Sequence, residues 1–233
     1  MITHLGLVKT TLVDVPGRVA ATVFTHGCPL ACPYCHNARL QGGPVPEDFL
    51  PRREVMDFLS RRAGMLEAVC ITGGEPMVHG DLPRLLHDLR DLGFFVKLDT
   101  SGVFPDRLRA VLEAELVDMV AMDLKTAPEH YHRLGGIGAE GGAAVLESLE
   151  LLRLFKVEYE LRTTLAPGVV EESDLQVLSG LLRGNERWTW AQFKPPSSAE
   201  NPQPQPVPYP VSTLQEWHAR YGNHPAKVSL RGA

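Results

Sequence analysis

The chain has 233 residues, of which 44% are hydrophobic and 22% are charged, an ordinary balance for a folded domain of this length. Its 23 basic and 28 acidic residues give a formal net charge of −5, so it lacks the basic excess typical of nucleic-acid-binding proteins. No apolar run approaches the roughly 18 residues of a membrane span, and no secretion signal precedes the first strand, so we expect a cytoplasmic protein that binds neither membranes nor nucleic acids.

Short apolar, β-branched runs alternate with amphipathic segments along most of the chain. We expect strands at 19–24, 67–72, 94–100, 116–125, 157–165 and 188–194. The amphipathic segments between them predict helices at 52–63, 81–93, 105–115, 143–155 and 173–184. Asp81 is a candidate N-cap for the second of these helices, and Ser173 or Asp174 for the fifth.

Repeated β–α units predict an α/β fold with parallel strands and right-handed crossovers. Six repeats are too few for a complete eight-repeat barrel, so we expect a partial (β/α)6 TIM-like barrel, with an open doubly wound sheet as the alternative. Residues 1–195 would form this domain. Residues 196–233 would form a tail, either packed on the barrel or mobile. The tail holds most of a proline-rich stretch (195–210), a short helix (212–222) and a possible strand (226–231).

Three of the four cysteines lie within the ten residues CPLACPYCHN, at positions 28–37. Cys32-x-x-Cys35 alone fits a redox dithiol, and together with His36 it fits the attachment of a c-type haem. With Cys28 added, the three thiols fit a four-iron cluster with one open iron, and the same thiols with His36 fit a zinc site. Clustered thiols in a reducing cytoplasm more often bind metal or react than form disulfides. The fourth cysteine, Cys70, lies in an apolar run and is expected in the core.

Polar residues also follow the ends of the later strands. In chain order these are Gly73-Gly74-Glu75-Pro76, Asp99-Thr100-Ser101-Gly102, Asp123 with Lys125, Arg162-Thr163-Thr164, and Gln192 with Lys194. Each group has a structural alternative: a tight turn, helix capping, a solvated ion pair or a solvent-facing side chain. Because the carboxyl ends of parallel strands meet at one edge of a barrel, their common position instead predicts a single shared site.

The cysteine stretch resembles the Cys-x-x-x-Cys-x-aromatic-Cys signature of the radical S-adenosylmethionine (SAM) superfamily. Gly73-Gly74-Glu75 resembles that superfamily's methionine-binding turn. Together with VDVPGRVAATVFTHG, GGEP, DTSG and DLK, roughly residues 5–195 are similar to the activating enzymes of glycyl-radical proteins. The likeness is greatest to the activator of anaerobic ribonucleoside-triphosphate reductase, and next to the pyruvate formate-lyase activator.

The resemblance implies a [4Fe–4S] cluster on Cys28, Cys32 and Cys35, with SAM at the open iron and cleaved there to a 5′-deoxyadenosyl radical. It implies that the glycine turn and Glu75 bind the amino group of SAM. The candidates for the rest of SAM are Lys125 and Arg162 for the carboxylate, Asp99, Thr100 and Ser101 for the ribose, and Tyr34 through His36 for the adenine. Asp99 and Asp123 are also candidates for holding a small cation. His26 is expected to be a structural neighbour of the cluster.

The implied substrate is a glycine of a partner glycyl-radical enzyme, with anaerobic ribonucleotide reductase as the leading candidate and a flavodoxin- or ferredoxin-like protein as electron donor. A hydrogen atom is transferred, so no acid–base pair is expected. Only Cys70 is left for a second cluster, which disfavours relatives with auxiliary clusters. The alternatives are a pyruvate formate-lyase-type activator, a radical SAM enzyme acting on a small molecule, and a zinc-binding module.

Overall fold

The computed structural model describes residues 1–137, 140–197, 200–222 and 227–231. Its strands are β1 His4–Thr11, β2 Ala20–Thr25, β3 Leu50–Pro51, β4 Ala68–Gly73, β5 Phe95–Thr100, β6 Met119–Asp123, β7 Glu158–Leu165, β8 Arg187–Gln192 and β9 Lys227–Arg231. Its α-helices are α1 Arg52–Arg62, α2 Leu82–Asp91, α3 Pro105–Glu113, α4 Glu140–Leu154, α5 Glu172–Leu181 and α6 Val211–Tyr221. Short 3-10 helices lie at η1 Ala38–Leu40, η2 Pro76–Val78 and η3 Pro128–Leu134. Within the described ranges, no helix has the length and apolarity needed to cross a bilayer.

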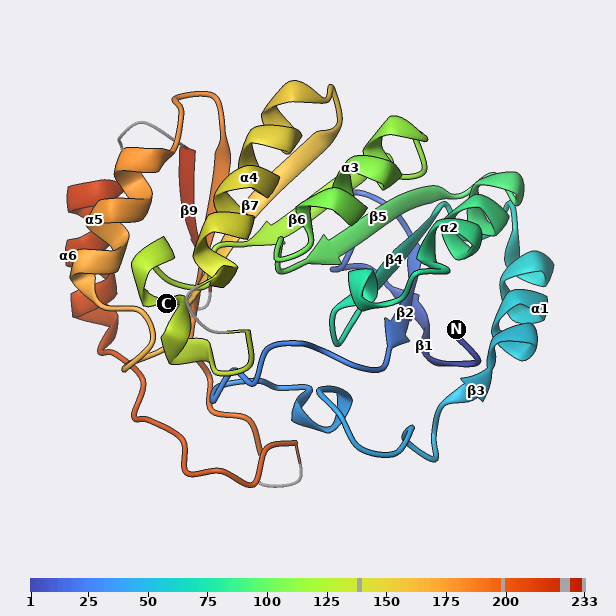
Figure 1. Cartoon of the computed structure of the whole chain (residues 1–233), viewed down its shortest axis with the longest axis horizontal. Helices are drawn as coiled ribbons and strands as arrows, with labels where there is room; N and C mark the ends of the chain where they lie inside the picture. Colours follow the sequence, from blue (N-terminus) through green and yellow to red (C-terminus); the bar gives the residue numbers. More distant parts are fainter. Residues whose placement is uncertain (138–139, 198–199, 223–226, 232–233) are drawn as a thin grey trace.

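All these strands belong to one curved sheet, in the order β3-β1-β2-β4-β5-β6-β7-β8-β9. The seven strands from β2 to β9 in that order run parallel, while β1 runs antiparallel to both of its neighbours. The helices cover one face of the sheet, and its edge strands β3 and β9 stay apart (Figure 1). The predicted α/β fold, an unclosed partial barrel, is confirmed, and the six predicted strands correspond to β2 and β4–β8.

The sheet is wider than predicted at both edges. β1 and β3 were not predicted from the sequence, because their strand conformation depends on pairing with β2 and with each other. At the opposite edge the possible strand of the tail is β9, which pairs in parallel with β8. The helix of the tail, α6, packs against α5. The tail thus continues the sheet, and the division of the chain at residue 195 stays a prediction.

The two faces of the sheet have opposite chemistry. Along each strand alternate side chains point to opposite faces. On β5, for example, Val96 and Leu98 belong to the main hydrophobic core, whereas Lys97 and Asp99 form an ion pair on the other face. Cys70 is confirmed as a core residue, because it has no exposed surface and lies in a small cluster with Val15, Ala20 and Ala68. The inner face of the barrel is therefore largely polar towards the carboxyl ends of the strands.

The start of α5 is built around Asp174, which has no exposed surface. The prediction that Ser173 or Asp174 is the N-cap of α5 is wrong, because Glu171 occupies that position. Asp174 completes a capping box by accepting the Glu171 N–H at 2.7 Å. The same carboxylate lies 2.6 Å from His130 Nδ1 and 2.8 Å from Arg133 Nη1. Asp81 does occupy the N-cap position of α2, but its carboxylate accepts the Ile2 N–H instead.

We expect Asp174→Asn to lower the free energy of unfolding by about 2 kcal/mol at pH 7, because charge-assisted hydrogen bonds to a buried carboxylate are lost. Burial alone would raise the pKa of Asp174, but its hydrogen bonds with His130 and Glu171 and the charge of Arg133 lower it below the ordinary 3.8. The carboxylate therefore contributes stability above pH 3.8, and this contribution is lost as the pH falls through the lowered value.

Denaturant unfolding at pH 7 and at successively lower pH values measures both effects. The difference between wild type and Asp174→Asn should shrink in acid. The exposed Glu129, on η3 beside His130, provides the control variant Glu129→Ala, which should change stability by less than about 0.5 kcal/mol. A constant difference between wild type and Asp174→Asn across the whole pH range would contradict the assignment.

Candidate functional site

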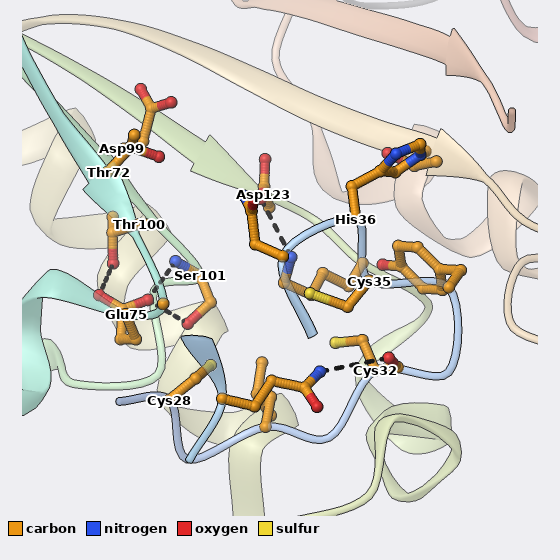
Figure 2. A pocket seen from close by; sticks show the side chains of 18 of the residues that line it. Cys28, Cys32, Cys35, His36, Thr72, Glu75, Asp99, Thr100, Ser101 and Asp123 are labelled. Atoms are coloured by element: carbon orange, nitrogen blue, oxygen red, sulfur yellow. Dashed lines mark hydrogen bonds and ion pairs between the residues drawn. The ribbon is translucent and has the colours of Figure 1, made fainter. Parts of the chain in front are cut away.

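One cavity at the carboxyl ends of the strands gathers every residue that the sequence analysis proposed for the cluster and for SAM. It is lined by Cys28, Cys32, Tyr34, Cys35, His36, Gly73, Gly74, Glu75, Asp99, Thr100, Ser101, Asp123, Lys125 and Arg162. The sulfur atoms of the three cysteines are turned toward the same space (Figure 2). Residues from five segments of the chain therefore meet at one place, as expected of a barrel.

The cysteine loop between β2 and η1 is closed by hydrogen bonds between its two ends. The Gly27 N–H donates to Leu40 O at 2.7 Å, and the Cys28 N–H donates to Gln41 O at 3.0 Å. Burial raises the pKa of the Cys28 thiol to about 12. Burial also raises the pKa of Cys32, although the nearby charge of Lys125 opposes the shift. Burial by itself thus favours the protonated form of both thiols, and a bound cation would be needed to hold them as thiolates.

The glycine turn after β4 touches the cysteine loop directly. The Gly74 N–H donates to Thr25 O at 2.9 Å, and the Glu75 N–H donates to Gly27 O at 2.8 Å. A Cβ on Gly74 would lie 2.2 Å from Gly27 O, and one on Gly73 would lie 2.4 Å from the Thr25 backbone. Gly73 also has a φ of +118°, a conformation that side chains disfavour. Only glycine at both positions permits this approach of two backbone segments.

Glu75 locks the glycine turn to the end of β5. Its carboxylate has 1% exposed surface and accepts hydrogen bonds from the Ser101 N–H at 2.7 Å and the Ser101 hydroxyl at 2.5 Å. The Thr100 hydroxyl donates to the other oxygen at 2.9 Å (Figure 2). The Met77 N–H donates to that same oxygen at 3.1 Å. Burial raises the pKa of Glu75 even though these donors oppose it. The four donors use the acceptor capacity of the carboxylate, so Glu75 holds the site together from beneath.

A chain of opposite charges crosses the cavity floor from β5 to β7. Arg162 Nη1 lies 2.9 Å from Asp99 Oδ2, and Arg162 Nε lies 2.9 Å from Asp123 Oδ1. Lys125 Nζ lies 3.0 Å from the second oxygen of Asp123. The guanidinium of Arg162 bridges Asp99 and Asp123, and the small cation expected between these two carboxylates stays a prediction. Burial works against the charged form of Asp123, but Arg162 and Lys125 outweigh it and lower the pKa to about 2.

The charge chain continues on the inner face below the cavity. Lys97 Nζ lies 2.8 Å from Asp99 Oδ1 and 3.8 Å from Glu160 Oε1. The side chains of Lys97 and Glu160 are almost fully buried. Lys97 and Glu160 were not predicted as site residues, although they stand two residues before the proposed site residues Asp99 and Arg162, respectively. That spacing puts side chains on the same face of a strand, which is the signal that could have identified them.

Thr164, which was expected at the strand ends with Arg162, also lines the cavity. Four further residues line it without having been predicted: Leu30, Asn37, Gln41 and Thr72. Gln41 donates to Cys32 O at 3.3 Å, and Thr164 shares a face of β7 with Arg162. Three predicted neighbours, His26, Gln192 and Lys194, are not part of the lining. Gln192 instead donates to Tyr209 O at 3.4 Å.

The donor set fits an iron–sulfur cluster. Soft thiolates are its usual ligands, and three of them face one cavity. Among the described residues, no three His, Cys, Asp or Glu side chains converge closely enough to hold one metal ion. A four-iron cluster does not require such convergence, since each thiolate binds a different iron.

Comparison with known proteins agrees with this geometry. The family model of the radical SAM superfamily matches residues 22–178, about two thirds of the chain. The "Putative glycyl-radical enzyme activating enzyme MJ1227" of Methanocaldococcus jannaschii is 29% identical over 199 residues, which cover 82% of this chain and 79% of that protein. A second protein of that organism with the same description, MJ1632, is 27% identical over 167 residues, or 69% of this chain and 62% of the relative.

Among solved structures, SuiB of Streptococcus suis bound to S-adenosylmethionine superposes with a TM-score of 0.65 at 13% sequence identity. The match covers 90% of this chain and 49% of SuiB. At this identity the likeness shows a shared fold. The matched region is about half the length of SuiB but includes nearly all of this chain.

Proposed function

The chain belongs to the radical SAM superfamily and is a radical SAM enzyme, and from that premise we propose that it activates a glycyl-radical enzyme. In this proposal the chain binds a [4Fe–4S] cluster and SAM in the cavity described above. The observation that carries the proposal is the match, over 82% of the chain, to a protein described as a glycyl-radical enzyme activating enzyme. We assign anaerobic ribonucleoside-triphosphate reductase as the partner, on the motifs of residues 5–195, and a flavodoxin- or ferredoxin-like protein as the electron donor.

A cluster held by this loop would supply the one electron that cleaves SAM to methionine and a 5′-deoxyadenosyl radical. We assign Cys28, Cys32 and Cys35 as the cluster ligands. Their loop is held at both ends by backbone hydrogen bonds, which orients the three thiols before any ligand binds. In the balanced reaction, SAM, one electron and the partner's glycine are consumed. The products are methionine, 5′-deoxyadenosine, which carries the hydrogen atom from the glycine, and a glycyl radical.

We assign the amino end of SAM to the backbone carbonyls of the glycine turn. The carboxylate of Glu75 is already saturated by four donors, so its contribution is to hold the turn in place. Lys125 is the better candidate for the SAM carboxylate, because Arg162 is committed to two carboxylates through two of its nitrogens. Lys125 has a single carboxylate partner, Asp123, and an ammonium has three donors.

We assign the ribose to the end of β5 and the adenine to the segment of Tyr34–His36. The Thr100 and Ser101 hydroxyls give their protons to Glu75, so toward a ligand their oxygens can act only as acceptors, and the Thr100 oxygen already accepts the Gly102 N–H at 3.1 Å. A ribose hydroxyl would donate to them. Tyr34 has 7% exposed surface and its ring packs edge-on against Phe193, which keeps it in a fixed orientation beside Cys35.

The test is anaerobic incubation of the reconstituted enzyme with anaerobic ribonucleotide reductase, SAM and reductant, read by electron paramagnetic resonance and by 5′-deoxyadenosine formation. We expect a glycyl doublet, and no doublet when the radical glycine of the partner is replaced by alanine. Formation of 5′-deoxyadenosine without a doublet would rule out this partner. Parallel incubation with pyruvate formate-lyase separates the two activator types.

A further inference from the structure

The segment of residues 200–210, here called the strap, leads into α6 and lies against the cysteine loop. In Figure 1 the two segments, orange-red and blue, run along the same side of the molecule. Every second residue of the strap from Pro202 to Pro210 is proline. Proline fixes φ and removes the backbone donor, so this segment is stiff and relies on side chains for its hydrogen bonds.

The far end of the strap is anchored at the start of α5. The Tyr209 hydroxyl lies 3.0 Å from Val170 O and 2.9 Å from the Glu171 carboxylate. The Tyr209 ring packs edge-on against Trp217 of α6, with the ring centroids 4.8 Å apart. A stiff segment fixed at this end can hold its other end in a defined position.

The near end of the strap is attached to the cysteine loop by Asn201, which is 3% exposed. The Asn201 side-chain amide donates to Pro33 O at 2.9 Å and to Cys35 O at 3.3 Å. Its oxygen accepts the Gln203 N–H at 3.1 Å. Gln205 also donates to Pro33 O, at 3.1 Å. The Asn201 amide thus binds two carbonyls, the one that precedes Tyr34 and the one of Cys35 itself.

Because of the geometry of the peptide bond, the hydrogen bonds of Asn201 also fix the direction of two backbone N–H groups. All peptide bonds of the described residues are trans, so each N–H points opposite to the C=O of the same peptide group. The carbonyls of Pro33 and Cys35 share their peptide groups with the N–H of Tyr34 and of His36. Those two N–H groups therefore point away from Asn201, and neither has an acceptor among the described residues.

We propose that Asn201 is a positioning residue for the cofactor site: it orients the peptide groups around Tyr34 and Cys35, so that Cys35 and two free N–H donors are held ready for the bound group. The inference rests on the assignment of the cluster to the three cysteines. It does not depend on the identity of the protein partner. Tyr34, Cys35 and His36 line the cavity, whereas Asn201 is not part of the lining and acts through them.

The test compares Asn201→Ala and Asn201→Asp with Gln203→Ala, whose exposed side chain makes no hydrogen bond with any described residue. We expect iron release to a chelator, measured anaerobically on the reconstituted protein, to be about tenfold faster in Asn201→Ala, because the Cys35 carbonyl loses its donor and the Pro33 carbonyl keeps only Gln205. The nearly isosteric Asn201→Asp replaces a donor with a charge that repels both carbonyls, so release should be faster still. SAM affinity should weaken in both, and Gln203→Ala should match wild type.

The unfolding temperature of each apoprotein separates positioning from general stability. Positioning predicts faster iron release even where the apoprotein unfolds at the wild-type temperature. Equal iron release and equal SAM affinity in Asn201→Ala and Gln203→Ala would overturn the inference, as would a fall in unfolding temperature alone. A wild-type protein that takes up no iron would overturn the cluster assignment and this inference together, whereas failure to activate a partner would count only against the proposed function.

Discussion

Replacing any one of Cys28, Cys32 and Cys35 with alanine is expected to abolish the cluster and, with it, the cleavage of SAM. The three thiols face one cavity and come from one closed loop, and the described chain places no other thiol there, so none can substitute for another. We expect iron content near background after anaerobic reconstitution. The 5′-deoxyadenosine yield should fall by more than about 100-fold, because even partners outside the ligand shell can contribute that much.

The control is Cys70→Ala, since Cys70 is free and buried but lies in the core cluster with Val15, Ala20 and Ala68. This variant should keep its full iron content and lose only about 1 kcal/mol of stability, through the smaller side chain. Iron and sulfide analysis, with the visible absorption spectrum, distinguishes the variants. Iron content in Cys32→Ala equal to that of Cys70→Ala would refute the assignment of the ligands.

The second large effect is expected at Glu75. In Glu75→Ala, the Ser101 and Met77 N–H groups and the Thr100 and Ser101 hydroxyls lose their buried acceptor. Unsatisfied buried donors cost about 1–3 kcal/mol each, but neighbouring losses are not additive. We therefore expect the free energy of unfolding to fall by about 4 kcal/mol, together with a loss of SAM binding, because the glycine turn and the end of β5 are no longer joined.

Glu75→Gln keeps the shape of the side chain but turns one acceptor into a donor facing Ser101 or Thr100. We expect an intermediate loss of about 2 kcal/mol, since some of the hydrogen bonds survive. The matched control is Glu113→Ala, an exposed glutamate on α3, which should be nearly neutral. Denaturant unfolding of the apoproteins measures all three, and a Glu75→Ala variant within 1 kcal/mol of wild type would show that the buried carboxylate does not join the two segments.

Much of the site could be predicted from the sequence because its parts are local in the chain. The spacing of Cys28, Cys32 and Cys35 is a property of one loop, and the glycines at 73 and 74 follow a recognisable strand. The six parallel strands were visible from their apolar periodicity, and parallel connection places the strand ends together. Cysteine spacing and strand order were therefore enough to predict which residues gather.

What those residues do to one another was decided only in three dimensions. Sequence spacing could not reveal that Glu75 is saturated by donors from residues 100 and 101, or that Arg162 bridges Asp99 and Asp123. Such contacts join residues 25 to 63 positions apart, and many pairings of charged side chains are compatible with the same strand pattern.

The same reason explains the strap. Asn201 lies 166 residues from Cys35, and nothing in its proline-rich surroundings indicates a contact with the cysteine loop. By itself, the sequence determined the barrel, the cysteine loop and the glycine turn, because periodicity and short spacings specify local structure. Only the tertiary structure decided which carboxylates are free, which cations are committed and which segment holds the loop, because hydrogen bonds and ion pairs between distant residues depend on the folded geometry.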